Sequence, residues 1–188
     1  PEVAFWREGE KTSLQLTGKL HGSNWNWAFA ASPAIEYRKT FTCDGTDTVH
    51  CEVALRPFAR SQMKGFLAHR IMLPAMSQWL ATGQDKVFSG QPGGPNTRTW
   101  QSKTSSFRDQ DAALAFTGLG GESLLLSHLD MTPKPQNVFI HQNGREPNLF
   151  LAWYDFDPVD VPTTWHRLTY DLKIVPGGVE AARKLVGR

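Results

Sequence analysis

The feature of this sequence that most restricts its fold is an alternation of apolar and polar residues with a period of two. Residues 34–43 follow this alternation, and it resumes in residues 48–55 after the turn Asp44-Gly45-Thr46-Asp47. Because successive side chains of a strand point to opposite faces, the pattern predicts an antiparallel hairpin. Gly, Pro, Asn and Asp interrupt the alternation repeatedly, and helical spacing is nearly absent. We therefore predict an all-β fold, an antiparallel β-sandwich.

The rest of the chain carries the same signal. Further strands are expected at residues 12–17, 65–73, 77–81, 98–107, 112–117, 123–128, 137–141, 148–156 and 166–174. Residues 148–156 are apolar on both faces and should form a central strand, whereas His166 to Ile174 should turn its even residues inward and its odd residues to water. Val179 to Val186 has helical composition, so we expect one sandwich domain over residues 1–176 and a C-terminal helix or linker over residues 177–188.

Length and charge narrow the class of protein. A chain of 188 residues is long enough for one well-buried core. The 20 basic and 18 acidic residues are evenly spread, so the sequence has no cluster of basic residues that would predict binding to a nucleic acid or an anionic membrane. No apolar run approaches the roughly 20 residues that a membrane-spanning helix needs. Val3 to Trp6 resembles the middle of a strand, so we expect the chain to be part of a larger multidomain polypeptide.

The two cysteines, Cys43 and Cys51, flank the turn of the predicted hairpin. Their shared parity with the apolar residues predicts that they lie on adjacent antiparallel strands with both side chains on one face. Two small buried thiols and a cross-strand disulfide both fit this placement, so bonding stays open.

The seven tryptophans divide by their surroundings. Trp6, Trp79 and Trp153 lie in apolar, strand-like sequence and are expected in the core.

Trp25 and Trp27 lie among small and amide-bearing residues, with Asn24 and Asn26 beside them. A spacing of two puts both indoles on one face of an extended segment. A sugar presents an apolar face of C–H groups and a rim of hydroxyls, so its site needs flat aromatic rings beside hydrogen-bonding groups. This segment supplies both, although an aromatic strand edge packed under a loop fits the same residues.

Trp100 lies in a strand of polar residues, where Arg98, Trp100 and Ser102 would share a face. That arrangement suits a polar ligand, and a tryptophan that covers one end of the sandwich is the alternative. We predict that a ligand site, if the chain has one, is formed by Trp25, Trp27 and Trp100 with Asn24, Asn26 and Arg98 as its polar rim.

Catalytic and metal-binding patterns are weak. The six histidines are scattered without metal-ligand spacing, so we expect neither a bound metal nor a cofactor. His128 and Asp130 would share a face and could orient a base, but a recognisable nucleophile is missing. Asp155, Asp157 and Asp160 could supply carboxylates to a structural calcium, although the run lacks the glycine and terminal glutamate of a calcium loop.

The strand rhythm of residues 34–41, 49–57, 148–157 and 165–176 resembles that of the large β-sandwich domains that accompany polysaccharide-active enzymes. These include carbohydrate-binding modules and galactose-mutarotase-like accessory sandwiches. The resemblance implies a jelly-roll-like or mutarotase-like sandwich, a carbohydrate partner and secretion; it carries over no catalytic residue.

Three functions follow from these observations. The first is a non-catalytic carbohydrate-binding or accessory module of a secreted enzyme that degrades polysaccharides. The second is a small sandwich hydrolase or lyase that draws an acid or base from His69, His128, His141 or the carboxylates of residues 155–160. The third is a structural or protein-interaction sandwich whose tryptophans are all core.

Overall fold

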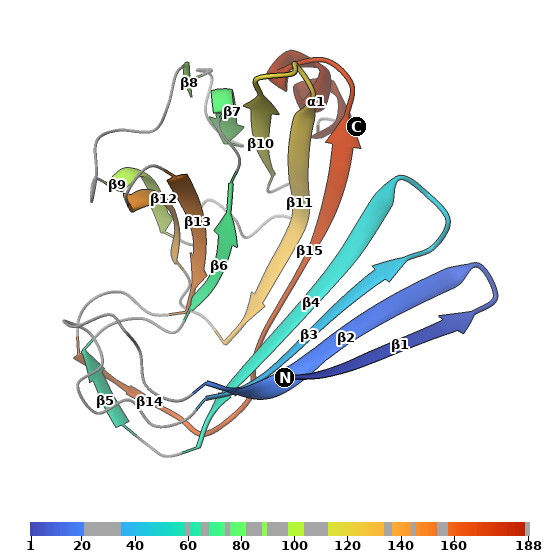
Figure 1. Ribbon diagram of the computed structural model, residues 1–188. Helices are drawn as coiled ribbons and strands as arrows, with labels where there is room; N and C mark the ends of the chain where they lie inside the picture. Colours follow the sequence, from blue (N-terminus) through green and yellow to red (C-terminus); the bar gives the residue numbers. More distant parts are fainter. Residues whose placement is uncertain are drawn as a thin grey trace.

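The fold was analysed in a computed structural model of the chain (Figure 1). The structure describes residues 1–20, 35–58, 61–64, 68–73, 76–81, 88–89, 98–103, 113–133, 137–143, 146–153 and 158–186.

Within these residues the larger of two facing sheets has nine strands, and every neighbouring pair is antiparallel. In spatial order the strands are β1 (Glu2–Glu8), β2 (Lys11–Leu20), β3 (Ile35–Cys43), β4 (Thr48–Pro57), β15 (His166–Val175), β11 (Ser123–Thr132), β10 (Leu114–Gly118), β7 (Met76–Ala81) and β8 (Phe88–Ser89).

A smaller antiparallel sheet faces the larger one (Figure 1). In the described part of the chain its four strands are, in spatial order, β6 (Ala68–Met72), β13 (Glu146–Ala152), β12 (Asn137–Asn143) and β9 (Arg98–Lys103). Strand β13 lies between two neighbours, as its continuous apolar character predicts. Two short strands, β5 (Ser61–Lys64) and β14 (Pro158–Val161), pair separately. The predicted all-β antiparallel sandwich is confirmed.

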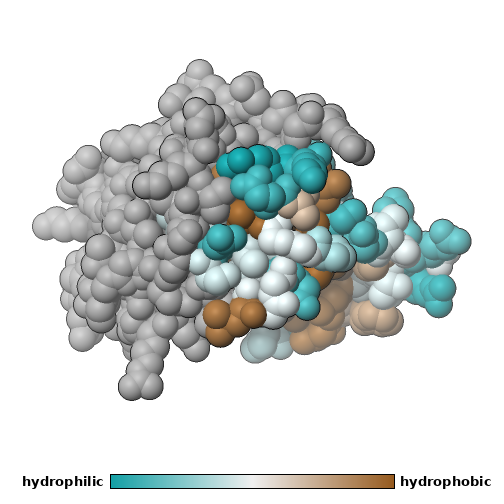
Figure 2. All heavy atoms as spheres, turned by 90° about the horizontal axis from the view of Figure 1, so that it is seen from above, coloured by the Kyte–Doolittle hydropathy of each residue, from teal (hydrophilic) through white to brown (hydrophobic). Residues whose placement is uncertain are grey.

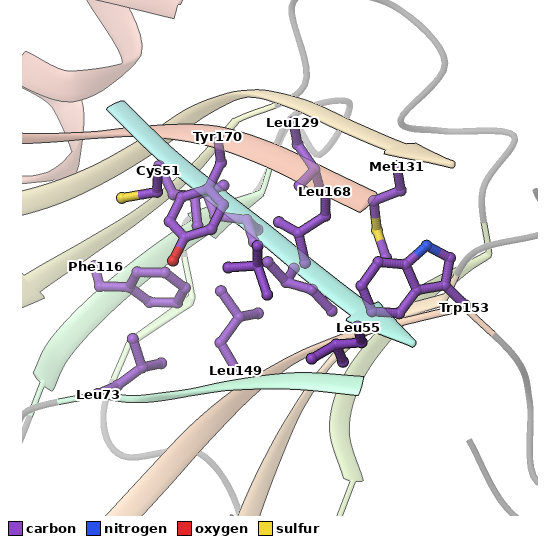
Figure 3. Packing of buried hydrophobic residues seen from close by; sticks show 14 of the residues in the cluster. Cys51, Leu55, Leu73, Phe116, Leu129, Met131, Leu149, Trp153, Leu168 and Tyr170 are labelled. Carbon is purple, nitrogen blue, oxygen red and sulfur yellow. The ribbon is translucent and has the colours of Figure 1, made fainter. Parts of the chain in front are cut away.

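The main core lies between the two sheets. Leu149, Leu151 and Trp153 come from β13 and the residue after it, and they pack with Val53 and Leu168 of the larger sheet. Figure 3 shows Leu149, Trp153 and Leu168 within this cluster. We call the face of the larger sheet that contributes to this core the inner face and the opposite one the outer face. Full burial of a leucine side chain contributes about 2 kcal/mol, so such contacts hold the two layers together.

A second cluster covers the outer face at one end of the sheet. Helix α1 (Val179–Val186) packs Val179 and Ala182 against five outer-face residues: Leu80, Ala113, Ala115, Leu125 and Val175. The predicted C-terminal helix is confirmed, and no helix in the described part of the chain is long and apolar enough to span a membrane.

This helix explains one wrong prediction about β15. Its even residues from His166 to Tyr170 are buried, as the alternation predicts, but Ile174 is 57% exposed and Val175 is buried. At this end α1 covers the outer face, which buries the odd residue Val175.

The hairpin of β3 and β4 agrees with its prediction. Gly45 has a φ of +88°, and Asp44 Oδ1 accepts hydrogen bonds from the backbone N–H and the hydroxyl of Thr46, which closes the turn. Cys43 pairs with Val49, and Cys51 pairs with Phe41. The cysteines therefore share a face, as predicted, but they are offset by two residues along the ladder and both are free thiols.

The edge strand β1 departs from the sequence prediction. Trp79 and Trp153 are buried as expected, but Trp6 is 36% exposed. Trp6 pairs with Ser13 on the outer face, and β1 has a neighbouring strand on one side only. All seven residues of β1 are exposed, among them the apolar Val3 and Phe5. In the view from above, hydrophobic side chains reach the surface beside hydrophilic ones (Figure 2).

Candidate functional site

Most of the ligand site predicted from sequence lies outside the described residues. This applies to Trp25, Trp27, Asn24 and Asn26. Those four residues stay a prediction.

For the two remaining members of that site, Arg98 and Trp100, the structure describes the backbone alone, in β9. Trp100 pairs with Ile140 and Arg98 pairs with His141, and the register shifts between these two pairs. A shift of this kind interrupts the alternation of side chains, so strict period-two reasoning does not place Arg98 and Trp100 on one face.

Four titratable side chains gather on the inner side of the sandwich. His69 comes from β6, Cys51 from β4, Tyr170 from β15 and Lys39 from β3. His69 Nε2 and the Tyr170 hydroxyl are hydrogen-bonded at 3.0 Å, and the two rings stack with 5.9 Å between their centroids. Cys51 lies directly opposite Tyr170 in the β4–β15 ladder.

Burial holds three of these groups in their neutral forms. It lowers the pKa of His69 to about 3, helped by the charge of Lys39, and it raises the pKa of Cys51 to about 11. It also raises the pKa of Tyr170 far above its usual range and lowers that of Lys39. A catalytic acid or base works best with a pKa near the operating pH, which neither His69 nor Tyr170 meets. The arrangement is that of a satisfied polar group inside a core.

The outer face holds a different group, in which one carboxylate lies between two imidazoles. Asp171 on β15 is paired with His50 on β4, and His128 comes from β11 on the other side. His128 Nδ1 donates to Asp171 Oδ2 at 2.9 Å, and His50 Nδ1 donates to Oδ1. In both contacts the imidazole Nδ1–H donates and a carboxylate oxygen accepts.

A bulge in β11 creates this group. The β11–β15 register shifts between Ser127 and Asp130, and His128 has a φ of 51°, a left-handed backbone that is rare outside glycine. His128 and Asp130 both lie on the outer face, but the carboxylate that accepts a hydrogen bond from His128 is Asp171, which the bulge brings into reach.

The contacts of His128 do not form a hydrolytic triad. Ser127 Oγ lies 3.4 Å from the same nitrogen, Nδ1, that donates to Asp171. A triad needs the nucleophile on one ring nitrogen and the carboxylate on the other. Within the described residues no three His, Cys, Asp or Glu side chains are arranged to hold a metal ion. Of the carboxylates proposed for calcium, Asp155 and Asp157 lie outside those residues, and for Asp160 the backbone alone is described.

A cluster of aromatic and cationic side chains lies at the other end of the outer face. Continuing the β4–β15 register by one residue places Trp165 opposite Arg56. The guanidinium carbons of Arg56 and Arg38 lie 4.8 and 5.3 Å from the centre of the half-buried Trp165 ring. Arg56 donates from Nε to Glu36 Oε2 at 3.0 Å and from Nη2 to the same oxygen. We call Trp165, Arg38, Arg56 and Glu36 the Trp165 site.

The strand register explains why these side chains meet. Tyr37 and Phe41 pack on the main core, so Glu36 and Arg38 point outward from β3. Two more cations border the site. Lys19 pairs with Glu36 across the strands, and its Nζ lies 5.1 Å from the centre of the Phe58 ring. The exposed Arg167 pairs with Ala54, which also pairs with Arg38.

Sequence reasoning missed the Trp165 site. Trp165 has polar neighbours in Thr163, Thr164 and His166, the same signal that singled out Trp100. Its partners Arg38 and Arg56 are far away in the sequence, and the β3–β4–β15 register alone brings them together.

Comparison with known proteins gives no assignment. No family model matches the chain, and no curated protein matches it. One solved structure that resembles it is a candidate aldose 1-epimerase from Klebsiella pneumoniae subsp. pneumoniae MGH 78578, with a TM-score of 0.43, 9% identity, and coverage of 96% of this chain and 55% of that one. Another is a candidate aldose 1-epimerase from Escherichia coli K12, with a TM-score of 0.42, 10% identity, and coverage of 93% and 68%. Likenesses this distant establish neither family nor activity.

Proposed function

We propose that this domain binds carbohydrate without transforming it, and that the Trp165 site is a contact surface for the sugar. The observation that carries the proposal is the meeting of an indole, two guanidinium groups and a carboxylate on one exposed sheet face. Sugars are recognised by aromatic surface for their C–H groups and by directed donors and acceptors for their hydroxyls. Regular strands hold these groups in place, which lowers the cost of ordering them when a ligand binds.

The non-catalytic part of the proposal rests on the burial of His69 and on the contacts of His128. Burial keeps His69 neutral, with a pKa of about 3. His128 uses one nitrogen for both of its neighbours, Ser127 and Asp171. The burial of His69 does not suit proton transfer on a glycosidic bond, and the described contacts of His128 place no nucleophile on its Nε2.

We also propose that the domain is an accessory module of a secreted polysaccharide-degrading enzyme. The resemblance in strand rhythm described above supports this context. The ligand site at Trp25, Trp27 and Trp100 remains the competing location for the same function.

The experiment that tests the proposal is isothermal titration calorimetry with a panel of neutral and acidic oligosaccharides. We expect Trp165→Ala to weaken binding by about 2 kcal/mol, roughly thirtyfold, since removal of an aromatic contact at the centre of a site has this cost. Trp6→Ala is the matched control, because Trp6 is also on the outer face but lies on the distant edge strand β1. Thermal unfolding of each variant separates lost binding from lost folding.

Two results would contradict the proposed location or function. If Trp27→Ala and Trp100→Ala abolish binding while Trp165→Ala leaves it unchanged, the sugar binds at the sequence-predicted site. If no member of the panel binds the wild-type protein, carbohydrate binding itself is wrong.

A further inference from the structure

The cations of the Trp165 site exceed the carboxylates available to them. Within the described residues, Lys19, Arg38 and Arg56 lie around Glu36, which accepts two hydrogen bonds from Arg56, and Arg167 lies in the row of Arg38. Glu2 lies in that same row on β1, two strands from Arg38. Arg38 contacts Trp165, and neither Arg38 nor Arg167 has a carboxylate partner in the described part of the chain. Two guanidinium groups therefore keep their donors free toward water.

The sheet fixes the spacing of these two arginines. Arg38 pairs with Ala54, and Ala54 pairs with Arg167, so the three residues form one row across β3, β4 and β15. Adjacent strands are about 4.8 Å apart, which puts the two arginine backbones roughly 10 Å apart. The side chain between them is the buried methyl group of Ala54, so a ligand that spans both arginines would contact their guanidinium groups and not the sheet itself.

We infer that the ligand of this site is an acidic polysaccharide, with carboxylate or sulfate groups that bind Arg38 and Arg167. This inference rests on the proposed function and adds the class of sugar. A guanidinium presents a planar fork of N–H donors that matches a carboxylate or sulfate with two parallel hydrogen bonds. Stacking on Trp165 restricts the Arg38 side chain beforehand, so less entropy is lost on binding.

The rest of the outer face favours an acidic sugar over a nucleic acid. The next rows of the same face carry Glu52, Asp130 and Asp171, so a carboxylate lies beyond the arginine row on β4, on β11 and on β15. A nucleic acid carries a charge on every nucleotide and needs an extended basic track. A row of two arginines bordered by carboxylates fits a short acidic segment instead.

The test is calorimetric titration of the chain with acidic tetrasaccharides and with the same molecules as methyl esters. The acidic series consists of oligogalacturonate, oligomannuronate and oligoglucuronate, and esterification removes the charge while keeping the sugar. We expect at least one acid to bind about tenfold tighter than its ester, and Arg38→Gln and Arg167→Gln each to remove most of that preference. Affinity for the acid should fall as salt rises.

Lys173→Gln is the matched control, because Lys173 is a cation on the outer face of β15 that already pairs with Asp47 at 3.0 Å. It should leave the preference unchanged. If the esters bind as tightly as the acids, the inference is wrong and the proposed function stands. If neither series binds, the inference is wrong, and the proposed function is then decided by the neutral oligosaccharides of the panel described above. Equal binding of polyglutamate would show that the site recognises charge without sugar and would overturn the inference.

Discussion

The inner and outer faces of the larger sheet both carry polar side chains, but the surroundings of these side chains differ. Between the two sheets, burial removes water from His69 of β6 and from Tyr170 of the inner face, which bond to each other and stay neutral. On the outer face, Arg38, Arg56 and Arg167 lie at the surface of the sheet. The polar groups in the core form hydrogen bonds with each other and so stabilise the fold. The arginines of the outer face keep hydrogen-bond donors that a ligand could use.

The largest expected effect concerns the core of the inner face. Leu168→Ala removes a side chain that is 1% exposed and leaves a cavity between the two sheets. We expect the free energy of unfolding to fall by about 3 kcal/mol, measured by urea denaturation. A loss below about 1 kcal/mol would show that the core relaxes around the gap.

The next effect is a dependence of stability on pH. The folded pKa of His69 is about 3, below the ordinary value of 6.5, so the unfolded chain binds a proton between these values and the folded chain does not. Stability from this residue is therefore complete above pH 6.5 and is lost as the pH falls toward 3, by about 2 kcal/mol at pH 5. His69→Gln should lower by one the number of protons taken up on unfolding, so the free energy of unfolding should depend less steeply on pH. Burial also lowers the pKa of His166, so part of the slope should remain.

A smaller effect compares one hydrogen bond on each face. Tyr170→Phe removes the hydroxyl that bonds His69 and should cost about 1–2 kcal/mol, because the imidazole is then buried without that partner. Gln15→Ala removes the outer-face bond from Gln15 Nε2 to Thr40 Oγ1, and its effect should stay within about 0.5 kcal/mol. Equal losses in the two variants would contradict the contrast between the faces.

Local alternation predicted the parts of the fold where one face of a strand is buried along its whole length. The hairpin of β3 and β4 follows it because Tyr37, Phe41, Cys51 and Val53 all contact the same core. The prediction was wrong where another element covers only part of a strand, and where a strand lies at the edge of the sheet. Ile174 is exposed at the end of β15 that α1 covers from the outer side, and Trp6 is exposed because β1 is an edge strand.

The candidate site was less accessible to sequence reasoning than the fold. The contacts of Trp165 with Arg38 and Arg56 depend on the pairing of β3, β4 and β15, which no local pattern encodes. The contact of His128 with Asp171 depends on a bulge and on a left-handed backbone at a histidine. No glycine or proline stands at this position to indicate such a conformation from the sequence.

The most direct test of the account is a two-dimensional nitrogen–proton NMR titration that follows the indole N–H signals of the seven tryptophans. Substitution of each tryptophan by phenylalanine assigns its signal, and the tightest-binding acidic tetrasaccharide is the probe. The account predicts that the Trp165 signal shifts with ligand concentration, while the signals of the buried Trp79 and Trp153 do not move. Shifts of Trp25, Trp27 and Trp100 with a stationary Trp165 signal would contradict it and would place the ligand at the site that the sequence predicted.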